Sequence, residues 1–467
     1  MKSIKCPGCR KENCNGCSLS VGGEINTNKN RTVILPEAVL KTEKKNGYGL
    51  VYDLGTTTMA AMLWNLETGE MVEAVTDYNP QRKVGSDVVS RITYALEDAE
   101  NAKKLQMQTV LQMDRMAEKL LALGKALFCE IKEVVVTGNT AMCEIFLGLS
   151  VEGLSRAPFK KAYHGNLSQL GRELGFSFLK DACVTVLPCI GGFVGADALS
   201  VYTYLKAVEK GDKILAVDIG TNGEILLWKE GIVYACSAAA GPALEGAAVK
   251  QGMSALVGAI SKVKMAGTFP REDIWCHVIG NAKPVGICGS GLVDALAVLI
   301  KEGLIEKDGY LKSRTEAVRS GVKERLCRRI CEIEGERAVL LTEEKAPVYL
   351  TAGDIRQLQL AKGAVRAAIQ VLLEKAEIRR EELSHCYLAG AFGSYIGIES
   401  AMEIGLIPVM PQEKISHAGN CASAGAAMAL LSKDVRAQMA ETAESIIHVE
   451  LAEEEGFRDY FLHYMGM

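Results

Sequence analysis

The sequence predicts an α/β protein in which one strand–turn–strand unit occurs twice. The first copy is LVYDLGTTTMAAML at residues 50–63, and the second is AVDIGTNGEILLW at residues 216–228. In each copy an apolar strand ends at an aspartate, a turn of small residues follows, and a second apolar strand returns. The two aspartates, Asp53 and Asp218, are 165 residues apart. This repetition predicts an internal structural duplication.

Each turn has the composition of a phosphate site. Backbone N–H groups and hydroxyls in a tight glycine–threonine turn suit phosphate oxygens. A carboxylate at the end of the strand can hold Mg²⁺, which prefers a few carboxylates together with phosphate and water. Two such turns facing each other would bind a polyphosphate from both sides; the alternative is two ordinary hairpins with solvated aspartates. The candidate nucleotide-binding residues in these turns are Gly55, Thr56, Thr57, Gly220, Thr221 and Asn222.

Length, charge and hydropathy restrict the class of protein. A chain of 467 residues is long enough for two or three domains with sizeable cores. The net charge of −4 gives no support for nucleic-acid binding, so no nucleic-acid partner is predicted. No apolar run reaches the roughly 18 residues of a transmembrane helix, so no membrane association is expected. The first residues, MKSIKCPGCRKENC, lack the apolar core of a signal peptide, and we therefore expect a cytoplasmic protein.

The cysteines fall into two groups. Four of the 15 form a C-x2-C-x4-C-x2-C pattern in a polar segment, namely Cys6, Cys9, Cys14 and Cys17. Such clustering predicts a metal site. The short x4 separation favours a four-iron iron–sulfur cluster over a zinc ribbon, with Zn²⁺ as the alternative and unliganded thiols as a third possibility. The other eleven, such as Cys129, Cys143 and Cys236, are expected to be mostly buried small hydrophobic residues.

Composition and periodicity divide the chain into four segments. Residues 1–20 form the cysteine-rich metal segment, residues 21–46 a polar linker, residues 47–208 a first folded unit and residues 209–467 a second.

The first unit continues the opening strands with alternating helices and strands. Helices are expected from Asp87 onward and over residues 102–129, and strands at 131–136 and 184–187. Between the strand at 131–136 and the next helix, Asn139 is a candidate phosphate contact through a helix N-terminus, or else a plain helix cap. A loop of small residues, PCIGGFVGADA, then enters another helix.

The second unit contains two further glycine-rich turns between a strand and a helix. Glycines at such turns allow the backbone to approach a nucleotide closely. The strand at 285–287 is expected to run into a helix at 292–300, and the strand at 386–389 into GAFG. The candidate nucleotide-binding residues here are Gly289, Ser290, Gly291, Gly390 and Gly393.

Several motifs accompany the two opening turns. They include NPQRKVGSDVVSRI, GNTAM, RAPF, GGFVGADA, ACSAAAGPALEG, GICGSGLVDAL, DIRQLQLAKGA and LAGAFGSY. Together with DLGTTT and VDIGTNGEI, they resemble the ATP-dependent reductive activators of corrinoid enzymes, within the acetate/sugar kinase, heat-shock 70 and actin superfamily. The resemblance extends roughly over residues 48–430. It implies an α/β fold of two ribonuclease-H-like lobes, here residues 47–208 and 209–467, with a nucleotide cleft between them.

The resemblance also implies a reaction and its participants. The activity is reduction of cob(II) to cob(I) in the corrinoid protein of a methyltransferase, coupled to ATP hydrolysis. The implied cofactors are ATP, Mg²⁺ and an iron–sulfur cluster, and the implied partners are the corrinoid protein and an upstream low-potential electron donor. A homodimer is expected. The candidate catalytic residues are Asp53 and Asp218 at Mg²⁺, with Glu224 or Glu245 positioning the attacking water.

Familiar members of this family carry a larger N-terminal ferredoxin-type domain, commonly a plant-type two-iron one. The spacing of the four clustered cysteines here differs from the plant-type pattern. Two alternative functions stay open: a small-molecule kinase on the same fold, and an ATP-dependent partner-binding protein with a structural zinc. The cysteine segment argues against the kinase, because phosphoryl transfer needs no sulfur ligands. Asn79–Arg91 is either part of a partner surface or an ordinary loop and helix start.

Overall fold

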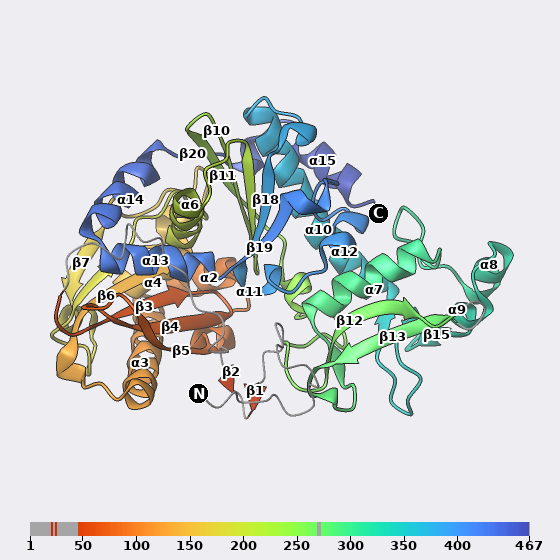
Figure 1. Cartoon of the computed structure of the whole chain (residues 1–467), viewed down its shortest axis with the longest axis horizontal. Helices are drawn as coiled ribbons and strands as arrows, with labels where there is room; N and C mark the ends of the chain where they lie inside the picture. The colour runs from red at the N-terminus through yellow and green to blue at the C-terminus, as the bar shows by residue number, and fades with distance from the viewer. Residues whose placement is uncertain (1–19, 22–23, 26–44, 269–271, 467) are drawn as a thin grey trace.

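The computed structural model describes residues 20–21, 24–25, 45–268 and 272–466. Its two large sheets repeat one strand order (Figure 1). In the first sheet, β5, β4 and β3 are antiparallel, and β6 and β8 continue the sheet parallel to β3. In the second, β11, β10 and β9 are antiparallel, and β18 and β19 continue parallel to β9. The predicted pair of ribonuclease-H-like sheets is therefore confirmed.

The strands have the following bounds. The first sheet contains β1 (Ser20–Val21), β2 (Glu24–Ile25), β5 (Met71–Tyr78), β4 (Thr58–Asn65), β3 (Tyr48–Leu54), β6 (Ile131–Gly138), β8 (Cys183–Val186) and β7 (Leu167–Leu170). The second contains β19 (Ile415–Gly419), β18 (His385–Ala389), β9 (Ile214–Ile219), β10 (Gly223–Lys229), β11 (Ile232–Ala238) and β20 (Ile447–His448). Two small sheets contain β13 (Asp273–Val278), β12 (Ala259–Ala266) and β14 (Gly286–Ile287), and β15 (Ile330–Ile333), β16 (Glu336–Leu340) and β17 (Tyr349–Thr351).

The helices cover the sheets and connect them. They are α2 (Val88–Glu97), α3 (Ala99–Gly124), α4 (Thr140–Leu147), α5 (Gly171–Leu174), α6 (Ala196–Val208), α7 (Gly289–Lys301), α8 (Arg314–Arg319), α9 (Glu324–Arg328), α10 (Ala352–Lys375), α11 (Gly390–Gly393), α12 (Ile398–Glu403), α13 (Cys421–Leu431), α14 (Lys433–Ser445) and α15 (Phe457–Tyr464). None of the helices in the described ranges is long and apolar enough to cross a membrane.

Local chemistry explains several helix ends. Asp87 caps α2, because its carboxylate accepts a hydrogen bond from the N–H of Ser90 at 2.8 Å. The long helix predicted to reach residue 129 ends at Gly124 instead, since Lys125 takes a left-handed conformation with φ of 55°. Cys129 is consequently exposed, which corrects the expectation of a buried cysteine there, whereas Cys143 and Cys236 are buried as expected.

The duplication extends into the cores. Trp64 near the end of β4 and Trp228 near the end of β10 hold matching places in the two hairpins, and each is 1% exposed. Both belong to one hydrophobic core, in which α13 packs against β3, β6 and α6 (Figure 1). A second core fills the space around β9, α7 and α10.

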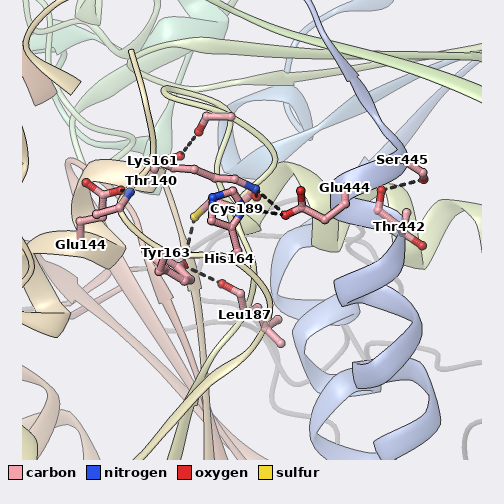
Figure 2. Close-up of polar contacts among 12 residues, drawn as sticks. Thr140, Glu144, Lys161, Tyr163, His164, Leu187, Cys189, Thr442, Glu444 and Ser445 are labelled. Carbon is pink, nitrogen blue, oxygen red and sulfur yellow. Dashed lines mark hydrogen bonds and ion pairs between the residues drawn. The ribbon is translucent and has the colours of Figure 1, made fainter. Parts of the chain in front are cut away.

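Polar contacts connect helix α14 to the first half of the chain (Figure 2). The Lys161 ammonium and the His164 ring nitrogen Nδ1 both contact the Glu444 carboxylate at 3.0 Å. The Arg436 guanidinium also contacts the Glu133 carboxylate in β6, at 2.7 Å. Helix α14, which lies between β19 and β20 in sequence, therefore contacts the first half of the chain before the last strand of the second sheet is added.

Candidate functional site

The first turn, between β3 and β4, is held from behind by buried side chains. The Asn79 amide donates to the carbonyl oxygen of Gly55 at 2.9 Å, and the Arg91 guanidinium donates to that of Thr56 at 2.6 Å. Asn79 and Arg91 are 2% and 0% exposed, so they lie inside the protein. Because the C=O and N–H of a trans peptide point in opposite directions, the N–H groups of Thr56 and Thr57 point away from this support. The turn is thus shaped to offer donors to an anion.

This arrangement also bears on Asn79–Arg91, for which a partner surface was one interpretation. Gln81 is 0% exposed, and its amide donates to Leu105 and Thr109 of α3. Asn79 and Arg91 therefore support the turn after Asp53 from inside the protein, and Gln81 links Arg91 to α3. Arg82, in contrast, is exposed and stacks on the Tyr78 ring at 4.3 Å.

The second turn, between β9 and β10, places Asp218 beside a required glycine. The N–H of Gly220 donates to the carbonyl of Asn222 at 2.9 Å, which closes the turn. Gly390, the first residue of α11, has φ of +80°, and a Cβ atom there would lie 2.2 Å from Oδ1 of Asp218. The GAFG motif therefore begins with glycine because Asp218 occupies the space that a side chain would need.

Carboxylates from both lobes gather between the turns. Burial, together with the charges of Asp197 and Asp218, raises the pKa of Asp53 to about 8. Burial raises the pKa of Asp218 to about 7, again with a contribution from Asp197, and that of Asp197 to about 6. Glu224 faces Asp218 across the β9–β10 pair, and burial together with these aspartates raises its pKa as well. Such mutual repulsion is typical of a site that awaits a cation.

Sequence reasoning missed Asp197 and Ser423. Asp197 lies in the first turn of α6, directly after GGFVG, and an acidic residue entering a helix behind a glycine-rich loop is the signal that could have identified it. Ser423 lies at the N-terminus of α13, where its hydroxyl donates to Oδ2 of Asp53 at 3.5 Å. Ser423 is 370 residues from Asp53 in sequence, and no local pattern indicates this contact.

The two turns meet directly. The hydroxyl oxygens of Thr57 and Thr221 lie 3.0 Å apart, one on each hairpin. Both hydroxyls also donate to Oε2 of Glu245, at 3.2 Å and 2.9 Å respectively. Burial raises the pKa of Glu245, whereas these hydroxyls and the charge of Arg82 lower it. Sequence-predicted residues from three separate segments are therefore brought together at one point.

The other sequence-predicted residues have structural partners within the chain. The Asn139 side chain caps α4 by accepting from the N–H of Ala141 at 3.1 Å, and it donates to the carbonyl of Phe193 at 2.9 Å. Gly289, Ser290 and Gly291 begin α7 and are buried. A Cβ at Gly289 would lie 1.9 Å from the carbonyl oxygen of Leu244, and one at Gly291 would lie 2.4 Å from that of Ile260.

These glycines therefore allow close packing of α7 against its neighbours, and Gly393 likewise ends α11 against the backbone of Leu388. Contact of Asn139 and of these turns with a nucleotide stays a prediction.

The donor chemistry fits Mg²⁺ with a polyphosphate. Within the described part of the chain, no group of three or more His, Cys, Asp or Glu side chains is close enough to hold a metal ion by itself. Mg²⁺ seldom uses such a protein cage, because it keeps several waters and binds one or two carboxylates plus phosphate oxygens. Asp53 and Asp218, one at each turn, match that requirement. The four clustered cysteines, Cys6, Cys9, Cys14 and Cys17, lie outside the described residues.

Comparison with known proteins gives consistent matches over nearly the whole described chain. The family model for the C-terminal domain of RACo, the ASKHA domain, matches residues 212–467, and the model for the RACo middle region matches residues 48–208. A corrinoid activation enzyme of Eubacterium limosum is 34% identical over 430 residues, which span 90% of this chain and 70% of the relative.

Two further matches agree. A reductase of the Co(II) methylated amine-specific corrinoid protein from Methanosarcina barkeri is 27% identical over 445 residues, covering 89% of this chain and 76% of the relative. The solved structure of a reductive activator for a corrinoid, iron–sulfur protein superimposes with a TM-score of 0.80 at 31% identity. That superposition covers 91% of this chain and 67% of the solved chain.

Proposed function

This chain belongs to the RACo family, and we propose that it is an ATP-dependent reductive activator that returns the Co(II) corrinoid of a partner protein to the Co(I) state. The relatives named as a corrinoid activation enzyme and as a Co(II) corrinoid protein reductase support this assignment. The single observation that carries it is the meeting of Asp53, Asp218 and the two threonine turns between the repeated sheets. We infer that the partner is the corrinoid protein of a methyltransferase system.

The site residues divide the work of binding and hydrolysing ATP. Asp53 and Asp218 hold Mg²⁺, which neutralises phosphate charge and relieves the repulsion between the carboxylates. Gly55, Thr56 and Thr57 on one side, and Gly220, Thr221 and Asn222 on the other, donate hydrogen bonds to the phosphates. Glu224 and Glu245 are the candidates for orienting the attacking water. Catalysis in such a site is mostly positioning and charge stabilisation.

The clustered cysteines bear on where the electron comes from. Their pattern favours an iron–sulfur cluster that accepts electrons from a low-potential donor. An absorbance scan of anaerobically purified protein, with iron and zinc analysis, distinguishes the possibilities. Sulfide-to-iron absorption bands would support electron transfer through this segment. A colourless protein with one zinc per chain would indicate that the segment binds a structural zinc and carries no electrons.

Coupling to ATP requires that the bound nucleotide changes the relative affinity of this chain for the two redox forms of its partner. A ligand shifts an equilibrium only by its differential affinity for the two states. To drive an uphill electron transfer, the ATP-bound chain must therefore bind the cob(II) and cob(I) forms of the corrinoid protein with a different ratio of affinities than the ADP-bound chain. Movement of the two lobes about the cleft is the element that can produce this difference.

The test is a titration of cob(II)- and cob(I)-loaded corrinoid protein with this chain, in ATP, in ADP and without nucleotide. We expect the ratio of the two dissociation constants to depend on the nucleotide. Equal affinity for both redox forms in every nucleotide state would remove the mechanism and favour the small-molecule kinase.

A further inference from the structure

The contact between Thr57, Thr221 and Glu245 has an unusual composition. Three oxygen atoms lie within hydrogen-bond distance of one another: the two hydroxyl oxygens at 3.0 Å, and Oε2 of Glu245 at 3.2 Å and 2.9 Å from them. Each hydroxyl has a single hydrogen to donate. When Glu245 is ionised it can only accept, so each hydrogen given to the carboxylate is unavailable to any other acceptor.

Glu245 is held in this place by a rigid segment. It ends the 3₁₀ helix Pro242–Glu245, which starts with a proline and is followed by Gly246 at φ of +84°. The preceding residue, Leu244, is 0% exposed, and its carbonyl oxygen packs against Gly289 of α7. The carboxylate therefore approaches both turns from a third element that belongs to neither hairpin.

The geometry leaves a phosphate oxygen in competition with this carboxylate. A phosphate that enters between the turns accepts hydrogen bonds from the hydroxyls that now serve Glu245, and each hydroxyl must turn from one acceptor to the other. A carboxylate and a phosphate oxygen are both ionised acceptors that form charge-assisted hydrogen bonds, so the carboxylate is an effective competitor. Glu245 accepts from a hydroxyl of each turn, at the point between them.

We propose that Glu245 is a positioning residue that competes with the terminal phosphate of a nucleoside triphosphate for the hydroxyl hydrogens of Thr57 and Thr221. This inference rests on the proposed binding of ATP between the two turns. Glu245 thereby joins the two turns in the nucleotide-free chain and lowers the affinity for nucleoside triphosphate relative to diphosphate. ADP, which lacks the terminal phosphate, does not displace it.

The test measures the affinity of the full chain for Mg²⁺-AMP-PNP and for Mg²⁺-ADP by calorimetry. The variants are Glu245→Asp, whose shorter side chain keeps the charge but withdraws from the hydroxyls, and Glu245→Gln, which keeps the length but loses the charge. Glu67→Gln, in the exposed turn after β4, is the matched control. We expect both Glu245 variants to bind AMP-PNP about fivefold or more tightly than the wild type, with ADP affinity unchanged within about twofold.

The possible outcomes separate the explanations. Unchanged or weaker AMP-PNP binding by Glu245→Asp overturns the competition. A gain for both nucleotides that appears only in Glu245→Gln indicates simple charge repulsion and also overturns it. A wild-type chain that binds neither nucleotide refutes the proposed function itself, which is a distinct result.

If the Glu245 variants do not fold, hydrogen exchange of the wild-type chain still tests the proposed competition. AMP-PNP should speed exchange at residues 241–246 relative to ADP, because the segment loses its two side-chain tethers. Equal exchange in the two nucleotides contradicts the proposal.

Discussion

The buried carboxylates near the two turns destabilise the folded protein when they are ionised. Asp53, Asp197 and Asp218 repel one another, and burial disfavours their charged forms, so the pKa of each is raised. A purely structural cluster would pair such groups with cations. Their arrangement makes sense when a bound cation and its polyphosphate complete the site.

Replacing Asp218 by asparagine should therefore stabilise the nucleotide-free protein and damage its function. We expect a higher Tm without nucleotide, since one buried like charge is removed, and a fall of about 10²-fold in ATP hydrolysis, since a preorganised electrostatic group is lost. Asp53→Asn should behave in the same way. Thermal melting and a phosphate-release assay measure the two effects, with the exposed Asp434→Asn as control. Full ATP hydrolysis in both cleft variants would refute the two-turn site.

Glu144 in α4 provides a pH-dependent contribution away from the cleft. Burial raises its pKa to about 7 from the ordinary 4.5, although the N–H of Ala162 donates to it. Its Oε2 atom is buried without a hydrogen-bond partner among the described residues. Because the folded pKa lies above the unfolded one, its protonated form stabilises the fold below about pH 4.5, and that contribution is lost as the pH rises through about 7.

The Glu144→Gln variant should remove this dependence. Its free energy of unfolding relative to wild type should be higher at pH 8 than at pH 5, as measured by urea denaturation at both values. A difference between variant and wild type that is the same at pH 5 and pH 8 would contradict the assignment.

At the scale of elements, the turns after Asp53 and Asp218 depend on residues that lie outside the two hairpins. The first turn is braced by Arg91 at the start of α2, and the second by the glycine that begins α11. The conformation of each turn therefore depends on its hairpin and also on the N-terminus of one helix that packs against it.

Gly390→Ala tests this dependence. The substitution adds a Cβ 2.2 Å from Oδ1 of Asp218 and strains a backbone with φ of +80°, so both the free energy of unfolding and ATP hydrolysis should fall. Gly231→Ala, at φ of +82° with nothing within 4 Å, is the matched control for strain alone. We expect the control to cost about 1 kcal/mol and to keep its activity. Equal destabilisation and full activity in both variants would show that Asp218 does not depend on the space beside it.

The sequence predicted well those elements whose chemistry is local. The strands on both sides of Asp53 and Asp218, and the helices capped by Asp87 and begun by GSG, follow from apolar runs and turn residues. The strands β12, β13, β15, β16 and β17 were not predicted, because they are short, pair within small sheets and lack a clear period. Asp197 and Ser423 were missed because only the tertiary fold brings them to Asp53.

At the scale of the whole molecule, the turns of the two repeated sheets meet, and later helices return to the first sheet. The helix α13, which follows β19, packs on β3 and β6, and α14 is tied to Lys161 and His164 through Glu444 (Figure 2). The N-terminus of α13 also delivers Ser423 to Asp53. A packed helix of the second half of the chain therefore reaches the Asp53 carboxylate, an arrangement that suits the proposed dependence of partner affinity on the bound nucleotide.

The central claim is that ATP hydrolysis in this cleft drives reduction of a corrinoid protein. The most direct measurement is the rate at which the Co(II) paramagnetic resonance signal of a corrinoid protein disappears under a low-potential donor, with this chain and either ATP, ADP or AMP-PNP. The account predicts rapid loss of the signal only with ATP, and a loss slowed by about 10²-fold in the Asp218→Asn variant. Reduction at the same rate without nucleotide, or with the variant, would contradict it.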